Sequence, residues 1–531
     1  MEFRRSLHWG MQSLTQTERW LIRIGCLVPF ISSIALMAWY WPGSLPQDSS
    51  SGVWTALAQD FARGVFYRPT ADTFGFGGTR YMPMFFVLHG SLIRLSLDPV
   101  AAGLILTVAS LALFDIALCF TLHELGVEWS LAFPLCVLAH AAVSFQLLSL
   151  QVKGDFLAAA LNMWGICFGL RYARRASGLS FWASAAAFLG AFLTKFTTIG
   201  GAVAVCGWLF GTGQRRRAVA LAGTLALLGA GAFGFVVWSS AGRALASFLA
   251  VADGGTRPGY ALGAPLWFLL VALQDPVFLL LLGVASWCAV TAVRAQGWRF
   301  PAAYFVVAAA LTVVIFTSPG TDTNHFIDLI GAVVLLLGWR LTTAPGRARV
   351  AAGVPVVLAG LTAATWIPGM ISVKSVIEKG GKPERRKVAA IVTRLGPSGH
   401  DLLSENPILP VLAGERPRVL DPFNLRLLAL ERPDVAAEFR RRMSDGSFGA
   451  VVLVDWTGSD PAHVSAALRT CTGSEGDRCY GEVVFPPGFL QALERNYVLS
   501  FVEHPFVVYQ PRFRSRQLGV APGAAGVPSA P

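Results

Sequence analysis

Apolar segments long enough to cross a lipid bilayer recur along most of the chain. A crossing helix needs roughly twenty mainly apolar residues. Segments of about this kind, separated by polar connections, fall near 20–41, 99–122, 130–149, 156–172, 179–195, 198–213, 217–239, 276–293, 300–317, 326–341 and 350–370. The pattern therefore predicts a polytopic α-helical membrane protein with about eleven transmembrane helices.

The first polar connection, residues 42–98, is much longer than most of the others and mixes charged with aromatic residues. Apolar residues at helical spacing between Ser51 and Arg63 predict a helix on the membrane surface, with Asp60 on its solvated face. Tyr81 to Ile93 is apolar but too short to cross, so we expect a re-entrant or surface helix. Long ordered loops usually carry function, and we expect the active-site face here.

The chain changes character after Ile371. Helical spacing follows at 388–395, and strand-like runs occur at 401–404, 450–455 and 497–509. We expect a C-terminal α/β domain over 371–518. Residues 519–531 are rich in Gly, Ala and Pro and are expected to be disordered.

Composition and charge place these parts relative to a membrane. Only 14% of the 531 residues are charged, against about a quarter in a soluble domain. The net charge of +12 comes largely from arginines that flank apolar segments, at 4–5, 171–175, 215–217, 294–299 and 340–349. Positive residues favour the cytoplasmic side. This predicts a bacterial inner-membrane protein with a cytoplasmic tail at 1–19, the long loop outside and the C-terminal domain in the periplasm; nucleic acid is not an expected partner.

The shorter outer connections carry further polar side chains, at Lys153, Asp155, Lys195, Asn324, His325 and Asp328. Taken singly, each has a plain alternative, namely a side chain that reaches the interface or a residue that caps a helix. Because all of them fall on the same predicted face, we expect them to bind phosphate or sugar hydroxyls. Asp115 lies deep in the second span, where a hydrogen bond between helices is the expected role.

Cysteine usage adds one expectation. Six of the eight cysteines fall in apolar segments and are expected to be simply buried. Cys471 and Cys479 fall in the predicted outer domain, where an oxidising compartment would permit a disulfide. No zinc-type ligand spacing or phosphate-binding glycine loop is present, so we expect no cofactor; a divalent metal is not indicated by the sequence but is left open.

Several motifs resemble the GT-C superfamily of membrane glycosyltransferases, and in particular protein O-mannosyltransferases and lipid A aminoarabinose transferases. They are an early acid in the first outer loop, Asp48, followed by "ARGVFYRP", "TRYMPMFFVLHGSL", "KGDFLAAALNMWGI", "FLTKFTTI" and "TNHFIDLIGAVVLLLG". The resemblance covers roughly 20–370. It implies inverting transfer of a sugar from a polyprenyl-phosphate donor to a lipid, glycan or protein acceptor at the outer face.

The resemblance also implies residue roles. Asp48 matches the acidic residue that acts as base or positions the acceptor, although Ser49 follows it where the family commonly has a second acid. Phosphate is expected to be held by cations among Arg68, Arg80, Lys153 and Lys195. Loop aromatics such as Tyr81 are expected to stack on sugar rings.

Two other classes fit less well. A transporter or lipid flippase predicts charges in mid-membrane and a repeat of two halves, whereas here the charges gather at one face. A structural or assembly protein would not need polar groups at several span ends.

Overall fold

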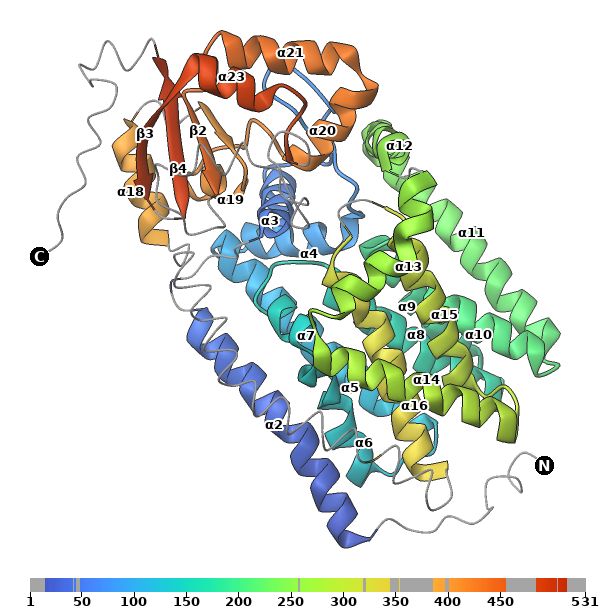
Figure 1. Ribbon diagram of the computed structural model, residues 1–531. Coiled ribbons are helices and arrows are strands. Elements are labelled where there is room, and N and C mark those ends of the chain that lie inside the picture. The colour runs from blue at the N-terminus through green and yellow to red at the C-terminus, as the bar shows by residue number, and fades with distance from the viewer. Residues whose placement is uncertain are drawn as a thin grey trace, which may run out of the picture.

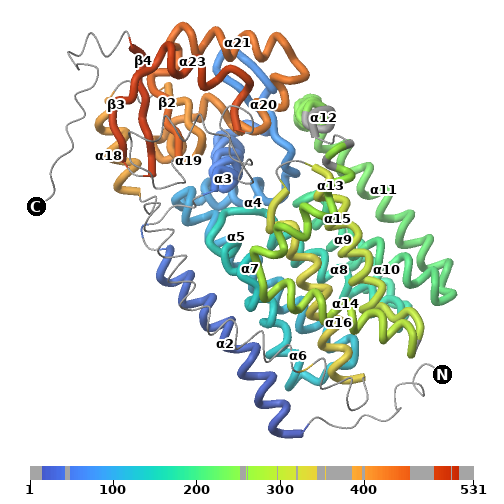
Figure 2. Tube along the Cα trace, viewed as in Figure 1, coloured from blue at the N-terminus to red at the C-terminus, as the bar shows by residue number. Residues whose placement is uncertain are grey.

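The computed structural model describes residues 15–41, 43, 48–255, 258–318, 321–343, 353, 385–396, 401–454, 484–503 and 505–512. A bundle of helices forms the larger part, and a small sheet with its own helices sits against one end of it (Figure 1). The helices α3 (Ser49–Ala62) and α4 (Pro83–Arg94) lie between the two parts. The tube in Figure 2 shows the same order, with the long α2 (Gln16–Tyr40) along one side of the bundle.

Within the described residues, six segments are long and apolar enough to cross a membrane. They are α2, α5 (Pro99–Glu124), α8 (Asp155–Arg175), α11 (Arg215–Ser239), α14 (Pro276–Gln296) and the pair η3 (Thr323–Phe326) and α16 (Ile327–Thr343). Shorter apolar helices include α9 (Gly178–Thr194), α10 (Gly200–Gly211) and α15 (Phe300–Ile315). The prediction of a multi-pass helical membrane protein is confirmed. The number of crossings stays a prediction, and the segment 350–370 lies outside the described residues.

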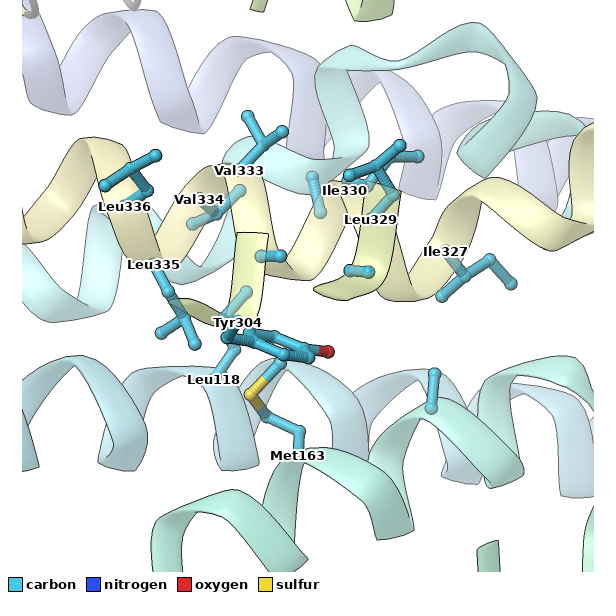
Figure 3. Close-up of a cluster of buried hydrophobic side chains, with 14 of the residues drawn as sticks. Leu118, Met163, Tyr304, Ile327, Leu329, Ile330, Val333, Val334, Leu335 and Leu336 are labelled. Carbon is cyan, nitrogen blue, oxygen red and sulfur yellow. The ribbon is translucent and has the colours of Figure 1, made fainter. Parts of the chain in front are cut away.

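The helix α16 forms the centre of the bundle. Its most apolar window is 83% buried, whereas that of α11 is only 11% buried and faces outward. A helix that is apolar on every side belongs in a bundle core, and Figure 3 shows Leu118, Met163 and Tyr304 of other helices around the α16 side chains. At Gly338 an added Cβ would lie 2.5 Å from a Leu122 methyl group, so the glycine permits close helix packing.

The expected continuous span over 130–149 is wrong. The chain forms α6 (Trp129–Cys136), the 3-10 helix η2 (Val137–Ala141) and α7 (Val143–Leu148) instead. The interruption is stabilised from another helix, because the Asp275 carboxylate accepts hydrogen bonds from the Ser144 backbone N–H at 2.9 Å and hydroxyl at 2.7 Å. Beside it, His140 Nε2 lies 3.1 Å from Asp115 Oδ2, which confirms the expected link between helices at Asp115.

The segment between Ser239 and Gln274, expected to be a polar outer connection, is also different. It contains α12 (Arg243–Gly255) and the apolar α13 (Pro258–Ala272). Ala264, Val271 and Ala272 are buried in the main core. The sequence pattern did not predict α13, because the Gly and Pro residues near its start are typical of a loop.

The helix α3 occurs where the spacing of apolar residues predicted a helix. It is packed inside the protein and does not lie on a membrane surface as expected. Every residue from 51 to 60 is buried. One side packs on α4, and the other approaches α19 (Ile408–Leu412) of the C-terminal segment. At Gly52 an added Cβ would lie 2.1 Å from Asn406 Oδ1, so the two backbones are in close contact. The apolar face of α3 is covered by protein.

The C-terminal segment contains a four-stranded sheet in the order β1-β2-β4-β3. The strands are β1 (Leu402–Ser404), β2 (Ala450–Val454), β3 (Tyr497–Glu503) and β4 (Phe506–Pro511). The β1–β2 pair is parallel and the other pairs are antiparallel. The first two strands agree with the sequence prediction. The strand-like run expected over 497–509 is also strand, and these residues form the β3–β4 hairpin.

Among the described residues of this segment, the helices beside the sheet are α18 (Arg385–Leu395), α19, α20 (Pro422–Glu431), α21 (Pro433–Ser444) and α23 (Phe489–Asn496). The helix α12 of the bundle packs beside α20. Cys471, Cys479 and the tail 519–531 lie outside the described residues. The expected disulfide therefore stays a prediction.

Candidate functional site

A small pocket opens at the end of the bundle that faces the sheet. It is formed where α8 begins, α9 ends and η3 leads into α16. Its cavity volume is about 20 Å³, and the empty space at its mouth, which includes open solvent, is roughly 270 Å³. Most of the outer polar residues expected from the sequence lie in its wall. The lining residues are Asp155, Ala159, Lys195, Thr197, Thr198, Ile315, Asn324, His325, Ile327 and Asp328.

One wall of the pocket is a linked set of polar groups. Lys195, the C-cap of α9, pairs with Asp155, the first residue of α8. The Asn324 amide donates to the same Asp155 oxygen at 3.0 Å. The Asp155 side chain is 7% exposed and Lys195 21% exposed. The carboxylate thus fixes the lysine, while the ammonium retains access to the pocket.

A second set lies on the inner side. The Asn162 amide donates to Asp328 Oδ1 at 3.1 Å, and the Tyr304 hydroxyl donates to the Asp328 backbone carbonyl at 3.3 Å. The Asp328 side chain is thus positioned by a neutral amide, and the charge of Lys195 also acts on it. His325 also lines the pocket, and the charges of Lys195, Arg80 and Lys153 all act on it.

Asp48 lies at the start of α3, where it is the N-cap. Its carboxylate accepts from the Ser51 backbone N–H at 3.2 Å and from the hydroxyls of Ser50 and Ser51, and it pairs with Lys153 Nζ at 2.9 Å. The Ser51 hydroxyl oxygen also accepts from the Val152 N–H at 3.0 Å, which joins α3 to the connection before α8. An acidic N-cap followed by serines is a local arrangement that sequence predicts well.

This environment determines the charge of Asp48. Burial raises the pKa of the carboxyl, but the Lys153 ammonium and the two serine hydroxyls more than offset it, so the pKa lies below its ordinary value. Conversely, burial lowers the pKa of Lys153, while Asp48 and Asp155 raise it above its ordinary value. Asp48 is therefore ionised at neutral pH, which is the state that accepting a proton requires.

Arg80 and Tyr81 belong to the loop between α3 and α4. Tyr81 is close enough to Asp48, and Arg80 to His325 of the pocket, for electrostatic interaction. The Tyr81 ring stacks on Trp54 of α3, with centroids 4.3 Å apart. Burial raises the pKa of Tyr81 to about 12, and the charges of Arg80, Asp421, Lys153 and Asp48 also act on it. The charges of Arg80 and Lys153 also act on His325 of the pocket, so the residues around Asp48 lie near the pocket without forming its wall.

Arg68 does not join this site. Its side chain is 4% exposed and makes a two-point ion pair with Asp60, while Nη1 donates to the Pro417 carbonyl at 2.6 Å. Arg416 lies 3.4 Å from the same Asp60 carboxylate. Asp60 is therefore buried rather than solvated, which corrects the sequence expectation. Arg68 attaches the loop to the C-terminal segment, and we leave it out of the substrate site.

The residues of the C-terminal segment near the site were not anticipated. Asp421, the N-cap of α20, is buried and interacts electrostatically with Arg80, and the Arg80 guanidinium lies over the Phe423 ring, 4.9 Å from its centroid. An Asp-Pro-Phe sequence signals the start of a helix and nothing more. No sequence signal placed it beside residues far earlier in the chain.

A divalent cation would fit poorly at Asp48. Its oxygens already carry the Lys153 ammonium and two hydroxyls, and a second cation there would meet the lysine charge. Within the part of the chain that the structure describes, no three His, Cys, Asp or Glu side chains gather as a metal site would need. The expected absence of a metal cofactor stays a prediction.

Comparison with known proteins rests on structure alone. No protein-family model and no curated protein matches the sequence. ArnT from Cupriavidus metallidurans, solved with bound undecaprenyl phosphate, is similar over 92% of this chain and 97% of its own, with a TM-score of 0.55 and 14% identity. This chain has the GT-C fold.

A second GT-C structure agrees. The archaeal oligosaccharyltransferase AglB from Archaeoglobus fulgidus, in complex with an inhibitory peptide and a dolichol-phosphate, matches 93% of this chain and 74% of its own, with a TM-score of 0.51 and 11% identity. The GT-C resemblance inferred from the sequence motifs is confirmed at the level of the fold. The similarity extends beyond the bundle into the C-terminal segment, since it covers over 90% of the chain.

Proposed function

We propose that this GT-C chain is a glycosyltransferase that moves a sugar from a polyprenyl-phosphate donor to a lipid, glycan or protein acceptor. The observation that carries the proposal is a pocket lined by Lys195, with Arg80 and the Lys153 partner of the ionised Asp48 close enough for their charges to act on His325 of the pocket wall. An anionic lipid phosphate suits three cations, and an ionised carboxylate suits removal of a proton. The similar ArnT and AglB structures contain bound undecaprenyl phosphate and dolichol-phosphate, which supports the same class of donor lipid.

The proposed reaction forms one carbon–oxygen bond and breaks another. The acceptor hydroxyl oxygen attacks the anomeric carbon of the sugar from the side opposite the phosphate. The new carbon–oxygen bond forms as the bond to the phosphate oxygen breaks, so the configuration inverts. Asp48 takes the hydroxyl proton, and the polyprenyl phosphate leaves with the bonding electron pair. Lys195 and Arg80 stabilise the charge that grows on the leaving phosphate.

The remaining polar groups suit the sugar. Asp155, Asn324, His325 and Asp328 place acceptors and donors on the pocket wall, where sugar hydroxyls need them. Tyr81, rigid because it stacks on Trp54, supplies an aromatic face for the sugar ring or acceptor. These assignments stay proposals.

Lys195→Ala tests the donor site. Losing one charge-assisted contact to phosphate should weaken binding of polyprenyl phosphate by roughly ten- to a hundredfold. The measurement is titration of the purified protein in nanodiscs with undecaprenyl phosphate. Lys387→Ala, on α18 of the C-terminal segment, removes an equal charge outside the pocket and should bind as the unaltered protein does. Equal affinities for the Lys195 variant and the unaltered protein would remove Lys195 from the site.

We further propose that the pocket faces the outside of a bacterial inner membrane. The basic clusters at 171–175 and 215–217 lie at the bundle end remote from α3 and the sheet, as positive residues on a cytoplasmic face would. Reporter fusions after Arg175 and Gln214 should therefore show a cytoplasmic location, and a fusion after Ile371 an external one. A cytoplasmic signal after Ile371 would overturn this orientation.

A further inference from the structure

The three cations of the site are held in different ways. Lys153 pairs with Asp48, and Lys195 pairs with Asp155. For Arg80, the described residues provide no carboxylate within ion-pair distance, and the buried Asp421 carboxylate acts on it only from farther away. Its guanidinium lies instead over the Phe423 ring, at 4.9 Å from the centroid. A ring face directs a guanidinium without neutralising its charge or occupying its N–H donors. Arg80 is thus oriented and still able to bind an anion.

Phe423 has a fixed position because the start of α20 is fixed. Asp421 caps the helix, and its carboxylate accepts from the Asn424 backbone N–H at 3.2 Å. The Asp421 side chain is buried, and Pro422 occupies the first turn, where its ring favours helical geometry. Phe423 therefore projects from a rigid helix start.

The loop before Arg80 is paired with the strand-like segment before Phe423. The Phe76 N–H donates to the Arg418 carbonyl at 2.8 Å, and the Leu420 N–H donates to the Phe76 carbonyl at 2.9 Å. This is a parallel bridge between Phe76 and Val419. At Gly75 an added Cβ would lie 2.0 Å from the Arg418 carbonyl oxygen, so the contact requires glycine.

The bridge brings the chain before Arg80 close to the start of α20. It is a single parallel bridge, and α20 begins at Pro422, so the strand pairing does not continue as far as Arg80 and Phe423. Each of these residues follows its bridge residue by only four positions. The attachment of the loop to the C-terminal segment therefore brings the guanidinium near the ring.

We propose that Phe423 is a positioning residue, through which the C-terminal segment orients Arg80 toward the phosphate of the donor lipid. This inference rests on the proposed function and extends it, because it gives the C-terminal segment a part in donor binding. Arg80 contacts the phosphate, whereas Phe423 acts only through Arg80.

Phe423→Leu tests the proposal, since it keeps an apolar side chain but removes the ring. Loss of the cation–π contact should weaken binding of undecaprenyl phosphate by about two- to fivefold. In transfer assays, the KM for the donor should rise while kcat changes less, because the lost contact serves binding. Phe423→Tyr keeps the ring and should restore the affinity.

Phe74→Leu is the matched control. Phe74 lies under Arg416 and Arg418 in the same loop-to-segment interface, 4.9 and 4.1 Å from its ring centroid, but it does not contact Arg80. This variant should keep the donor affinity of the unaltered protein. If both leucine variants lost equal affinity, Phe423 would be a packing residue only, and the proposal would be wrong.

A double-mutant cycle with Arg80→Gln gives the decisive comparison. If Phe423 acts through Arg80, Phe423→Leu should have no further effect on donor affinity in the Arg80→Gln protein. Additive losses would overturn the proposal even if every variant folds. Failure of the unaltered protein to bind any polyprenyl phosphate would instead count against the proposed function itself, so the two failures are distinguishable.

Discussion

Replacing Asp48 with Asn should abolish most sugar transfer, while the protein still folds and binds the donor because Asp155 continues to stabilise the charge of Lys153. Asn is as good an N-cap as Asp, so α3 should still begin at the same residue. The amide cannot accept a proton at neutral pH, and loss of a general base typically costs a factor of about a hundred to ten thousand. The measurement is the initial rate at which polyprenyl phosphate is released from a polyprenyl-phosphate sugar in the presence of acceptor.

Asp98→Asn is the matched control for this change. Asp98 is also a helix N-cap, accepting from the Val100 and Ala101 backbone N–H groups, and it also pairs with a basic residue, Arg385. Its partner Arg385 belongs to α18 and is not one of the cations assigned to the donor, unlike the Asp48 partner Lys153. The Asp98 variant should transfer sugar at the normal rate. Normal transfer by the Asp48 variant would show that the proton acceptor is another group.

The second large effect concerns stability. Asp60→Asn should lower the free energy of unfolding by about 3–5 kcal/mol, because it leaves the buried Arg68 charge without its carboxylate. The apparent melting temperature in detergent measures the loss. Asp60→Asn combined with Arg68→Gln removes both charges and should be less destabilised than the single variant.

The exposed Arg432–Asp434 pair provides the comparison for Asp60. Its side chains are 49% and 66% exposed, and exposed pairs contribute little to stability. Asp434→Asn should therefore melt close to the unaltered protein. If Asp60→Asn kept its melting temperature but lost all transfer, Asp60 would replace Asp48 as the candidate base.

The long helices were predictable because their signal is local. The apolar runs of α5, α8 and α16 are set by their own sequences, and so is the N-cap at Asp48. The break at η2 was not predictable, because what stabilises it is Asp275, a residue distant in the chain. The surface position expected for α3 failed for the same reason, since Asn406 and its neighbours cover that face.

In the candidate site too, some residues could be predicted from local sequence, whereas others depend on contacts with distant parts of the chain. Lys153, Asp155, Lys195 and His325 were found because polar residues at the ends of apolar spans stand out. Sequence could not separate Arg68 from Arg80, because both lie among the aromatic residues of one loop. Only the fold shows that Arg68 is neutralised by Asp60, whereas Arg80 rests on the Phe423 ring.

The central claim is that the site cleaves a sugar–phosphate bond rather than carrying an intact lipid across the membrane. Reconstituted vesicles containing a labelled polyprenyl-phosphate sugar test this directly, with a cell-envelope extract as the acceptor source. We expect free polyprenyl phosphate to appear with labelled acceptor, and expect both products to be lost with Asp48→Asn. Movement of the intact donor between leaflets, with no polyprenyl phosphate released, would contradict the account and indicate a flippase.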